Sequence, residues 1–594
     1  MAKTKPSKLP YKTEWDLTLF YKSAKDPQIG KDIESTRKKI FTFSKKYKGK
    51  NFLKDNKTLF KTLSDFEEMS KEIGLTKVAF YYSYRKEINS TDTEAEAALA
   101  RISTLSAELA NEMAFFELEL GKIPKKRQRD ILLDKKFSHF RYFLENIFEN
   151  AKFHLTEPEE KILNLKSLPA HGLWKSGFGR VLGKQVVSFK GKEMPLAEVS
   201  SSYFNLKKNN RHALYKKMMQ TLESVSDFAE SEMNAIVTNK KINDELRGYK
   251  TPYEETVRGY ENRVETVETL RKLVKKFYKT SHKFYSVKAK LLGEKYLTNA
   301  DRNAPVGKLN KKIPFAEAVA TVREEFAKAD TKFAELLDHM LKNGQVDVYP
   351  KKGKRGGAFC SSEYGLPTFI MLNHTDDENS LSTLAHEMGH AIHSEYSKKQ
   401  GVLYEDYTIS TAEVASTFFE ALVFDATYQK ATEKEKVVLL HNKLHDDMST
   451  IFRQIACFEF EVDLHGTIRE QGYLDKKQIV KLMNKHMSAY LGPIVHMEEL
   501  DGYMFVSWPH IRRFFYVYSY AFGQIISAAL YAKYKEDPKF IDKVIEFLSA
   551  GGSMSPEDIF KSIGIDVTKP DFFETGLKQI DSQVKELEKL VKKQ

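Results

Sequence analysis

The sequence predicts a mainly α-helical protein with a small β-sheet, and three observations support this. Apolar residues recur at spacings of three and four over residues 99–120 and 577–591, as they do on the buried face of a helix. Two other stretches, residues 168–196 and 346–373, break this pattern and contain short runs typical of strands. The chain has 594 residues, 41% of them apolar and 30% charged, which is the composition of a large globular protein.

The two apolar stripes are expected to be packing surfaces without chemistry. The first is predicted to lie along one long helix, and the second along a C-terminal helix whose other face is rich in Lys and Glu. The first stripe consists of Leu99, Ile102, Leu105, Leu109, Met113, Phe116 and Leu120. The second consists of Leu577, Ile580, Val584, Leu587 and Val591.

The first irregular stretch, residues 168–196, is rich in glycine and contains a strand-like run at 186–190. We expect a boundary here, with an N-terminal helical region over residues 1–190 and a second domain over residues 191–594. All the candidate chemistry described below lies in the second domain.

The second irregular stretch predicts a small sheet directly before the helix that carries the main motif. Three runs are typical of strands, at 346–349, 356–360 and 368–372. Turns are expected between them, at Gly353 and around Pro367.

Charge and cysteine content exclude several classes of protein. The net charge of +13 comes from Lys and Arg spread among 82 acidic residues, without a long basic arm, so we expect a solvated surface and no nucleic-acid partner. The two cysteines, Cys360 and Cys457, cannot build a disulfide framework or a cysteine zinc site. Neither a secretory leader nor a run of ~20 apolar residues is present, which predicts a cytoplasmic protein without a membrane partner.

The main motif is the sequence HEMGH at 386–390. Residues 380–396 are predicted to form one helix, with Asn379 or Ser380 as N-cap. On such a helix His386 and His390 project from the same face one turn apart, where both can reach one metal ion. Glu387 is the next residue around this helix, close enough to reach a water on the metal.

The opposite side of this helix is expected to be buried. Leu384, Met388 and Ile392 lie on that side, and Gly389 would let another backbone approach closely. His393 lies on the same face as His390, and we expect it to be a buried or hydrogen-bonded histidine behind the metal ligands.

A catalytic zinc ion needs a third protein ligand and an open position. Glu413 is the best candidate, because it begins a polar stripe on a second helix, with Ser410 or Thr411 as the expected cap. Glu420, further along that stripe, is the alternative ligand or a partner of one. Two other downstream carboxylates fit less well, Glu395 because it lies too far round the first helix and Glu405 because it lies in a loop.

Several separated motifs together resemble the oligoendopeptidase F group of metallopeptidases, which is related to thimet oligopeptidase. The resemblance is strong from about residue 346 to the end, moderate from about 190 and weak before that. Its motifs are HEMGHA at 386–391, AEVAST at 412–417, GKRGGAF at 353–359, PH at 509–510, FYVYSYA at 515–521, RQ at 453–454, FEFE at 458–461, SAGGS at 549–553 and, more weakly, WDL at 15–17.

The resemblance implies a helical metallopeptidase with a deep substrate cleft, one zinc ion per chain and Glu413 as third ligand. It implies that the strand through Gly357, Ala358 and Phe359 pairs with the backbone of an extended peptide. The tyrosine-rich segment would supply hydrogen bonds to the transition state. The matching positions there are Tyr516 as oxyanion donor, His510 close to the substrate and Tyr520 as a third candidate.

The implied activity is hydrolysis of internal bonds in short unstructured peptides, with zinc-activated water and Glu387 as general base. Two alternatives stay open. One is a zinc carboxypeptidase or dipeptidyl peptidase on a similar scaffold, for which Arg512 or Arg513 would hold the substrate's terminal carboxylate. The other is a basic binding protein with a vestigial metal site, against which the intact Glu387 and complete ligand set argue.

Overall fold

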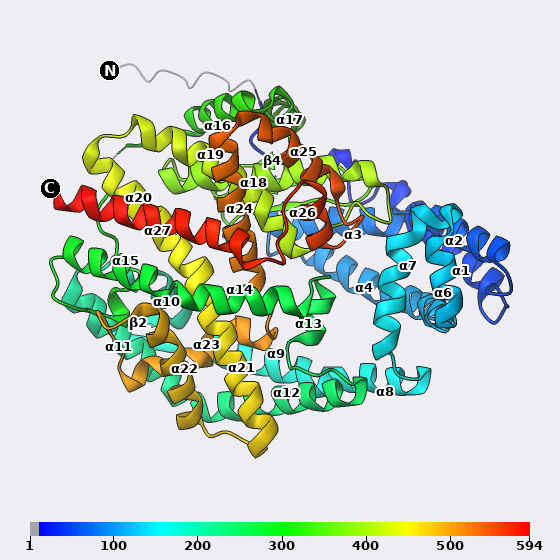
Figure 1. Ribbon diagram of the computed structural model, residues 1–594, viewed down its shortest axis with the longest axis horizontal. Helices are drawn as coiled ribbons and strands as arrows, with labels where there is room; N and C mark the ends of the chain where they lie inside the picture. The colour runs from blue at the N-terminus through cyan, green and yellow to red at the C-terminus, as the bar shows by residue number, and fades with distance from the viewer. Residues whose placement is uncertain (1–10, 310, 594) are drawn as a thin grey trace.

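The computed structural model describes residues 11–309 and 311–593, and its fold is mainly α-helical (Figure 1). Helices α1 to α27 account for most of these residues, and the strands β1 to β7 are short. The expected fold class, a large multi-helix protein with a small sheet next to the motif helix, is therefore confirmed.

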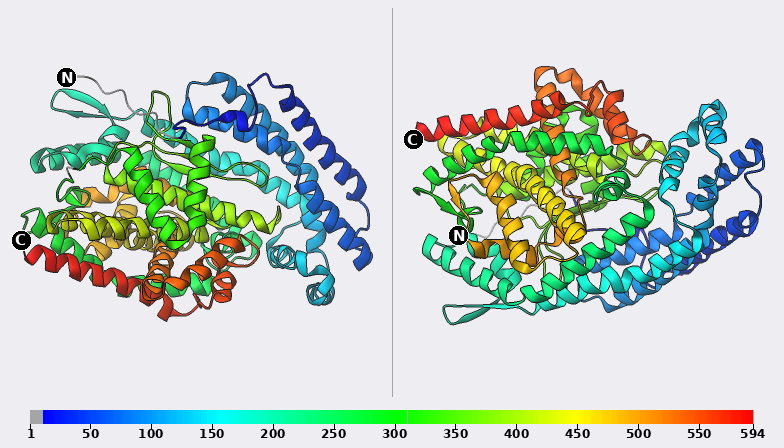
Figure 2. Two further views of the ribbon diagram at one scale, coloured as in Figure 1. Left: turned by 90° about the horizontal axis from the view of Figure 1, so that it is seen from above. Right: turned by 60° about the horizontal axis from the view of Figure 1, so that its bottom comes forward.

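The first helices form one end of the molecule (blue in Figures 1 and 2) and surround two apolar clusters. They are α1 (Pro27–Tyr47), α2 (Asn56–Ser70), α3 (Gly74–Ile88), α4 (Thr93–Met113), α5 (Phe115–Gly121), α6 (Lys125–Leu133) and α7 (Arg141–Asn150). Trp15 joins this end to the rest, because its indole donates a hydrogen bond to the carbonyl of Ile370 at 2.8 Å and its ring packs on Phe369.

Helix α8 (Glu157–Ser167) has no described residue in an apolar cluster, and the helices after it share one large apolar core. The first half of these are α9 (Leu173–Gly183), α10 (Leu196–Ser202), α11 (Lys208–Ser224), α12 (Ser226–Arg247), α13 (Glu254–Gly259), α14 (Val264–Lys276), α15 (Tyr278–Leu291), α16 (Phe315–Ala329) and α17 (Thr331–Asn343). The second half are α18 (Glu378–Ser397), α19 (Ile409–Lys430), α20 (Glu433–Asp447), α21 (Arg453–Gln471), α22 (Lys476–Leu491), α23 (Met504–Ser507), α24 (Tyr518–Glu536), α25 (Ile541–Ala550), α26 (Pro556–Ser562) and α27 (Pro570–Lys592).

The long N-terminal stripe does not lie on one continuous helix, which corrects the sequence prediction. Helix α4 ends at Met113 and α5 begins at Phe115. The stripe serves two cores: Ile102 packs in one apolar cluster and Phe116 in the other. The C-terminal stripe is confirmed on α27, where all its members up to Leu587 are buried.

A three-stranded sheet precedes the motif helix, as predicted. Strands β4 (Val346–Asp347), β6 (Phe369–Met371) and β5 (Phe359–Ser361) lie in the order β4-β6-β5, so β5 is an edge strand. The strands are shorter than expected, and β5 starts later because Gly357 takes a φ of +82°, which interrupts extended pairing. Two further pairs are β1 (Val186–Phe189) with β2 (Lys192–Pro195), and β3 (Leu297–Thr298) with β7 (Val495–His496).

The loop before β5 is held by a buried lysine. The ammonium of Lys354 lies 2.7 Å from the carboxylate of Asp347 and donates to the carbonyl of Tyr349 at 2.9 Å. These bonds fix the segment that leads from β4 to the edge strand.

The N-caps of α18 and α19 differ from the predicted ones. Helix α18 begins at Glu378 with Asp377 as its cap, because the Asp377 carboxylate accepts from both the backbone N–H and the hydroxyl of Ser380. Helix α19 begins at Ile409 after Thr408, since the hydroxyl of Ser410 is turned to Asn262, 2.7 Å away.

We predict that Gly389→Ala destabilises the fold. A Cβ at Gly389 would lie 2.7 Å from the Cα of Ser416 and 3.1 Å from the Cβ of Phe419, so α18 and α19 would have to move apart. Overpacking of this kind costs about 1–3 kcal/mol, and thermal unfolding should show a lower Tm.

The matched control is Gly466→Ala in α21, where a Cβ would meet nothing within 4 Å. That variant should be as stable as the parent or more stable by up to about 1 kcal/mol. Equal Tm values for the two variants would contradict the close approach of α18 to α19.

Candidate metal centre and active site

Two histidines and a glutamate converge between α18 and α19. One ligand atom from each of His386, His390 and Glu413 lies within 4.8 Å of the other two. The Nε2 atom of His386 is 3.7 Å from an Oε atom of Glu413, and the two imidazole rings are nearly perpendicular, with centroids 5.0 Å apart. Two imidazole nitrogens and one carboxylate oxygen form the ligand set of an open catalytic zinc site. Among residues 11–309 and 311–593 this is the only such group.

Glu413 is held in place from two sides. A Cβ at Gly523 of α24 would lie 2.7 Å from the Cβ of Glu413, so the missing side chain lets α24 pack directly on this residue. The hydroxyl of Ser416 lies 3.3 Å from the Glu413 carboxylate. The polar stripe predicted on this helix therefore does face the histidines.

Glu420 lies behind the ligand group. Its carboxylate is 3.2 Å from Nδ1 of His386, the nitrogen turned away from Glu413, and it accepts a hydrogen bond from Ser382 at 2.7 Å. Although burial lowers the pKa of His386, the bond to Glu420 and the surrounding carboxylates raise it to about 9. The site has an excess of negative charge that a divalent cation would balance.

Glu387 is buried on α18, next to the edge strand of the sheet. Burial raises its pKa to about 7, with His386 opposing the shift and Glu413 adding to it. The nearby backbone N–H of Cys360 in β5 also opposes this rise of the pKa. A 460 Å³ cavity is lined by Glu387, His386 and Ala358 together.

The predicted substrate strand borders this cavity through Ala358. Gly357 is exposed, and its carbonyl accepts from Asn373 at 2.6 Å. The ring of Phe359 packs against Trp15 with centroids 6.1 Å apart, so this side chain belongs to the core and not to the cavity.

The tyrosine segment reaches the metal group through one residue. Tyr520 lines a cavity with His386 and Glu413. Its hydroxyl lies 3.5 Å from that of Tyr516, which in turn is hydrogen-bonded to Nδ1 of His510. Tyr516 is only 3% exposed, and neither it nor His510 lines this cavity. The structure thus brings Tyr520 to the site and places the other two behind it.

Burial, with Arg453 and Arg513 nearby, lowers the pKa of His510 to about 4, so its imidazole is neutral at pH 7.

The turn before Tyr516 is strained, because Phe514 and Phe515 both have positive φ, at 52° and 59°. This strained turn was not predicted from the sequence.

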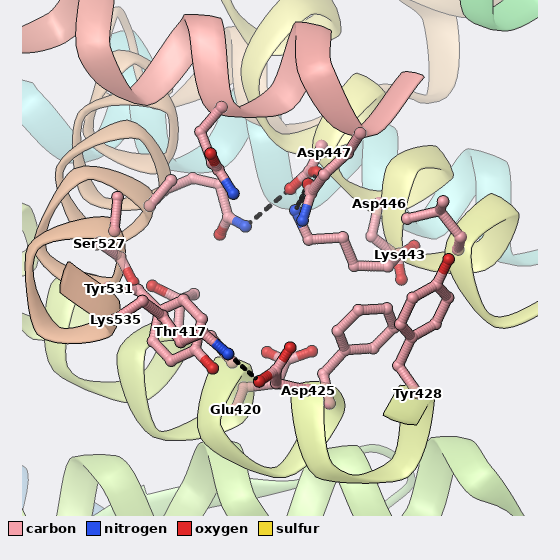
Figure 3. A pocket seen from close by; sticks show the side chains of 18 of the residues that line it. Thr417, Glu420, Asp425, Tyr428, Lys443, Asp446, Asp447, Ser527, Tyr531 and Lys535 are labelled. Atoms are coloured by element: carbon pink, nitrogen blue, oxygen red, sulfur yellow. Dashed lines mark hydrogen bonds and ion pairs between the residues drawn. The ribbon is translucent and has the colours of Figure 1, made fainter. Parts of the chain in front are cut away.

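The cavity at Tyr520 has a volume of about 790 Å³ and lies between α19, α20, α24 and α27 (Figure 3). Seven of its nine charged lining residues are acidic, although the chain as a whole is basic. Burial and the charge of Glu420 raise the pKa of Asp446 to about 7, and Lys443 pairs with Asp447 at 2.6 Å. The charged lining residues are Glu413, Glu420, Asp425, Lys443, Asp446, Asp447, Lys535, Glu536 and Glu586. Most of these were missed, because no local pattern marks residues that meet only in the folded chain.

The other candidates lie outside the ligand group. His393 is 1% exposed and stacks on Tyr407 with ring centroids 3.7 Å apart, which confirms it as a buried histidine. Glu395 binds Lys398 and the hydroxyl of Thr368. Glu405 is a buried loop residue whose pKa burial raises to about 7.

Arg512 cannot hold a substrate carboxylate, contrary to one of the sequence-based alternatives. It is buried, pairs with Glu232 at 2.7 Å and donates to the backbone carbonyls of Phe505 and Trp508. Arg513 is exposed, with its guanidinium 4.5 Å from the ring centre of Tyr516.

No helix in the described part of the chain is long and apolar enough to span a bilayer.

Comparison with known proteins agrees with this site. The profile of peptidase family M3 matches residues 205–579, and the profile described as oligopeptidase F matches residues 119–179. The chain is 26% identical to oligopeptidase PepF of Bacillus subtilis, over 99% of this chain and 90% of that protein. It is also 26% identical to an oligoendopeptidase F homolog of Borreliella burgdorferi, over 97% and 98%.

Solved structures show the same fold. A crystal structure from Chlamydophila abortus, described as a peptidase, matches with a TM-score of 0.83 at 23% identity, over 97% of this chain and 98% of that one. The oligoendopeptidase-F of Enterococcus faecium matches with a TM-score of 0.72 at 19% identity, over 95% and 99%. Since the M3 profile covers more than half of the sequence, the chain belongs to peptidase family M3, as a metalloendopeptidase of the oligoendopeptidase F group.

Proposed function

We propose that this metallo-oligopeptidase uses one zinc ion, held by His386, His390 and Glu413, to hydrolyse internal bonds of short unstructured peptides. The observation that carries the proposal is the convergence of these three ligand atoms within 4.8 Å. The donor set suits zinc, and the carboxylate of Glu420 on the remote nitrogen of His386 is the kind of partner that orients a metal-bound histidine.

When bound, zinc polarises the scissile carbonyl and makes water a stronger acid. The chain itself supplies the base. Glu387 faces the same cavity as His386. In the proposed reaction Glu387 takes the proton of the attacking water and passes it to the leaving amine nitrogen.

The edge strand β5 is the proposed docking site for the peptide backbone. Because β5 pairs only with β6, one side of it is free to add an extended peptide as a further strand. Ala358, directly before β5, borders the cavity at the metal group, so a peptide bound there would pass the proposed base. Recognition through the backbone depends little on which side chains the substrate carries.

Tyr516 and His510 are the proposed donors to the oxyanion, with Tyr520 in contact with the substrate. Because only Tyr520 lines the metal cavity in this structure, the other two would have to turn toward the cavity when a peptide binds. The three side chains form one hydrogen-bonded group on and before α24. A phenol and a neutral imidazole can each donate one N–H or O–H to developing charge.

We predict that Glu387→Gln keeps bound zinc but loses hydrolysis by roughly 10²–10⁴-fold, the range for a general base. Zinc content by mass spectrometry and peptide cleavage would be measured on the same preparation. Doubly blocked peptides of graded length are the substrates, since their cleavage requires an endopeptidase. Substantial residual activity would remove the general-base assignment.

Metal content should separate the roles of the two glutamates on α19. Glu413→Gln should lower bound zinc below one ion per chain after dialysis, because it removes a ligand. Glu420→Gln should keep the stoichiometry and weaken zinc binding by roughly 10–100-fold, as loss of a partner of a ligating histidine does. Glu395→Gln, on α18 but outside the group, is the control. Unchanged zinc in Glu413→Gln would assign the third ligand to another residue.

Variants of the tyrosines and of His510 should differ in which kinetic parameter changes, kcat or KM. Tyr516→Phe and His510→Gln should lower kcat by roughly 10²–10³-fold with little change in KM, as expected for oxyanion donors. Tyr520→Phe should mainly raise KM. Tyr428→Phe is the control, because Tyr428 lines the far wall of the cavity and bonds Glu586. A large loss of kcat in Tyr520→Phe alone would move the donor role to Tyr520.

A further inference from the structure

One peptide group in the turn before α24 is held by side chains from two other helices. It joins Phe514 and Phe515, the two aromatic residues with positive φ. Its C=O accepts a hydrogen bond from the hydroxyl of Thr256 in α13 at 3.1 Å. Its N–H donates to the carboxyl of Glu461 in α21 at 2.8 Å. We call the side chains of Thr256 and Glu461 the peptide clamp.

The peptide clamp opposes the rotation that would relieve the strain. A positive φ is unfavourable for a bulky residue, so Phe515 would gain by rotating about its N–Cα bond to a negative φ. That rotation changes the direction of the peptide group relative to Tyr516. It requires either that the peptide group leaves its two partners or that Tyr516 is displaced. With the clamp in place, the turn and Tyr516 therefore keep one relative orientation.

Glu461 makes its bond to the turn from a fully buried position. The residue is 0% exposed, and within the described residues its second carboxyl oxygen has no hydrogen-bond partner. Burial raises its pKa to about 8, so the carboxyl is mostly uncharged at pH 7. A buried carboxyl is costly compared with an apolar side chain of similar size unless its hydrogen bonds compensate. The N–H of Phe515 is the only partner that the described residues give it, so this bond accounts for a glutamate here.

Helix α21 also packs on the aromatic rings of the turn. The ring centre of His465, one helical turn after Glu461, lies 5.2 Å from that of Phe514 and 4.7 Å from that of Phe515. The ring centre of Phe458 lies 5.4 Å from that of Phe515. His465 and Phe458 are buried, as Glu461 is. The strained turn thus rests on α21, and Glu461 makes the polar contact between them.

The proposed oxyanion donors depend on the position of this turn. Tyr516 follows Phe515 directly, and its hydroxyl is hydrogen-bonded to Nδ1 of His510. Glu461 lines neither of the two cavities at the metal group, so a substrate bound in them does not touch it. An effect of Glu461 on the reaction therefore passes through the turn.

We propose that Glu461 is a positioning residue for peptide hydrolysis, which holds the peptide group between Phe514 and Phe515 and thereby fixes the backbone that carries Tyr516. This inference rests on the proposed function, in which Tyr516 donates to the oxyanion. Such a donor must be held within about 0.5 Å of its working position. A loose turn leaves the phenol on a backbone with several conformations, of which few are productive.

The first test compares two substitutions of Glu461. Glu461→Leu removes the acceptor and should lower kcat by roughly 10-fold or more, though by no more than Tyr516→Phe does, with little change in KM. Glu461→Gln keeps an uncharged acceptor oxygen and should restore kcat close to the parent value. Unchanged kcat in Glu461→Leu, or an equal loss in both variants, overturns the proposal.

The matched control is Glu557→Leu in α26. Glu557 is also buried, accepts one backbone N–H, that of Arg263, at 2.8 Å, and has a second oxygen without a partner in the described chain. Glu557→Leu should lower the Tm about as much as Glu461→Leu but leave kcat and KM at the parent values. An equal loss of kcat in both variants would reflect general destabilisation and overturns the positioning role.

A double variant tests whether the effect passes through Tyr516. In the Tyr516→Phe background, Glu461→Leu should lower kcat little further, because the donor that it positions is already absent. Fully additive losses overturn the proposal. Where the Tm shows that Glu461→Leu does not fold, Thr256→Val replaces it, because this variant removes only the other bond of the peptide clamp from a half-buried position.

Hydrogen exchange tests the peptide clamp without any reaction. The fragment that spans residues 511–518 would be followed by mass spectrometry, and it should exchange faster in Glu461→Leu than in the parent or Glu461→Gln. Faster exchange combined with a Tyr516→Phe variant of unchanged kcat supports the clamp and refutes only the donor role of Tyr516. Unchanged exchange in Glu461→Leu overturns the clamp whatever the kinetics show.

Discussion

The geometry of the site depends on how closely three helices approach each other. Because Gly389 has no side chain, the backbone of α19 lies against α18, and Glu413 comes within 3.7 Å of His386. Because Gly523 also has no side chain, α24 packs directly on Glu413. Three ligand-bearing or ligand-supporting elements are thus fixed by backbone contact, which is stiffer than contact through long side chains. A site built on helices in this way is held more precisely than one built on loops.

The predictions from sequence succeeded where one helix determines the answer. The spacing of His386 and His390 belongs to a single α-helix, and Glu413 required only the polar face of the next one. The buried face of α18 was equally predictable from its periodicity. Even here the predicted helix caps were wrong. Asp377 caps α18 through hydrogen bonds that several neighbouring residues could make, and Thr408 precedes α19 without a side-chain cap bond.

The parts that could not be predicted are those in which distant segments meet. Glu413 of α19 and Tyr520 of α24 line one cavity although they lie far apart in sequence. Composition is no guide either, because the positive net charge is that of the whole chain, whereas the charged residues that line the cavity beside the metal group are mostly acidic. Local electrostatics inside a cavity follow from the side chains that face it.

The strained turn before α24 links the metal ligands to the proposed donors. Left-handed backbone at two aromatic residues costs of order 1–3 kcal/mol each, so other contacts must hold Phe514 and Phe515 there. The buried carboxylate of Glu461 accepts the N–H of Phe515 at 2.8 Å, and the hydroxyl of Thr256 donates to the carbonyl of Phe514. Since α24 carries both Tyr520 and the glycine that packs on Glu413, any shift of this turn moves the phenols and the third ligand together.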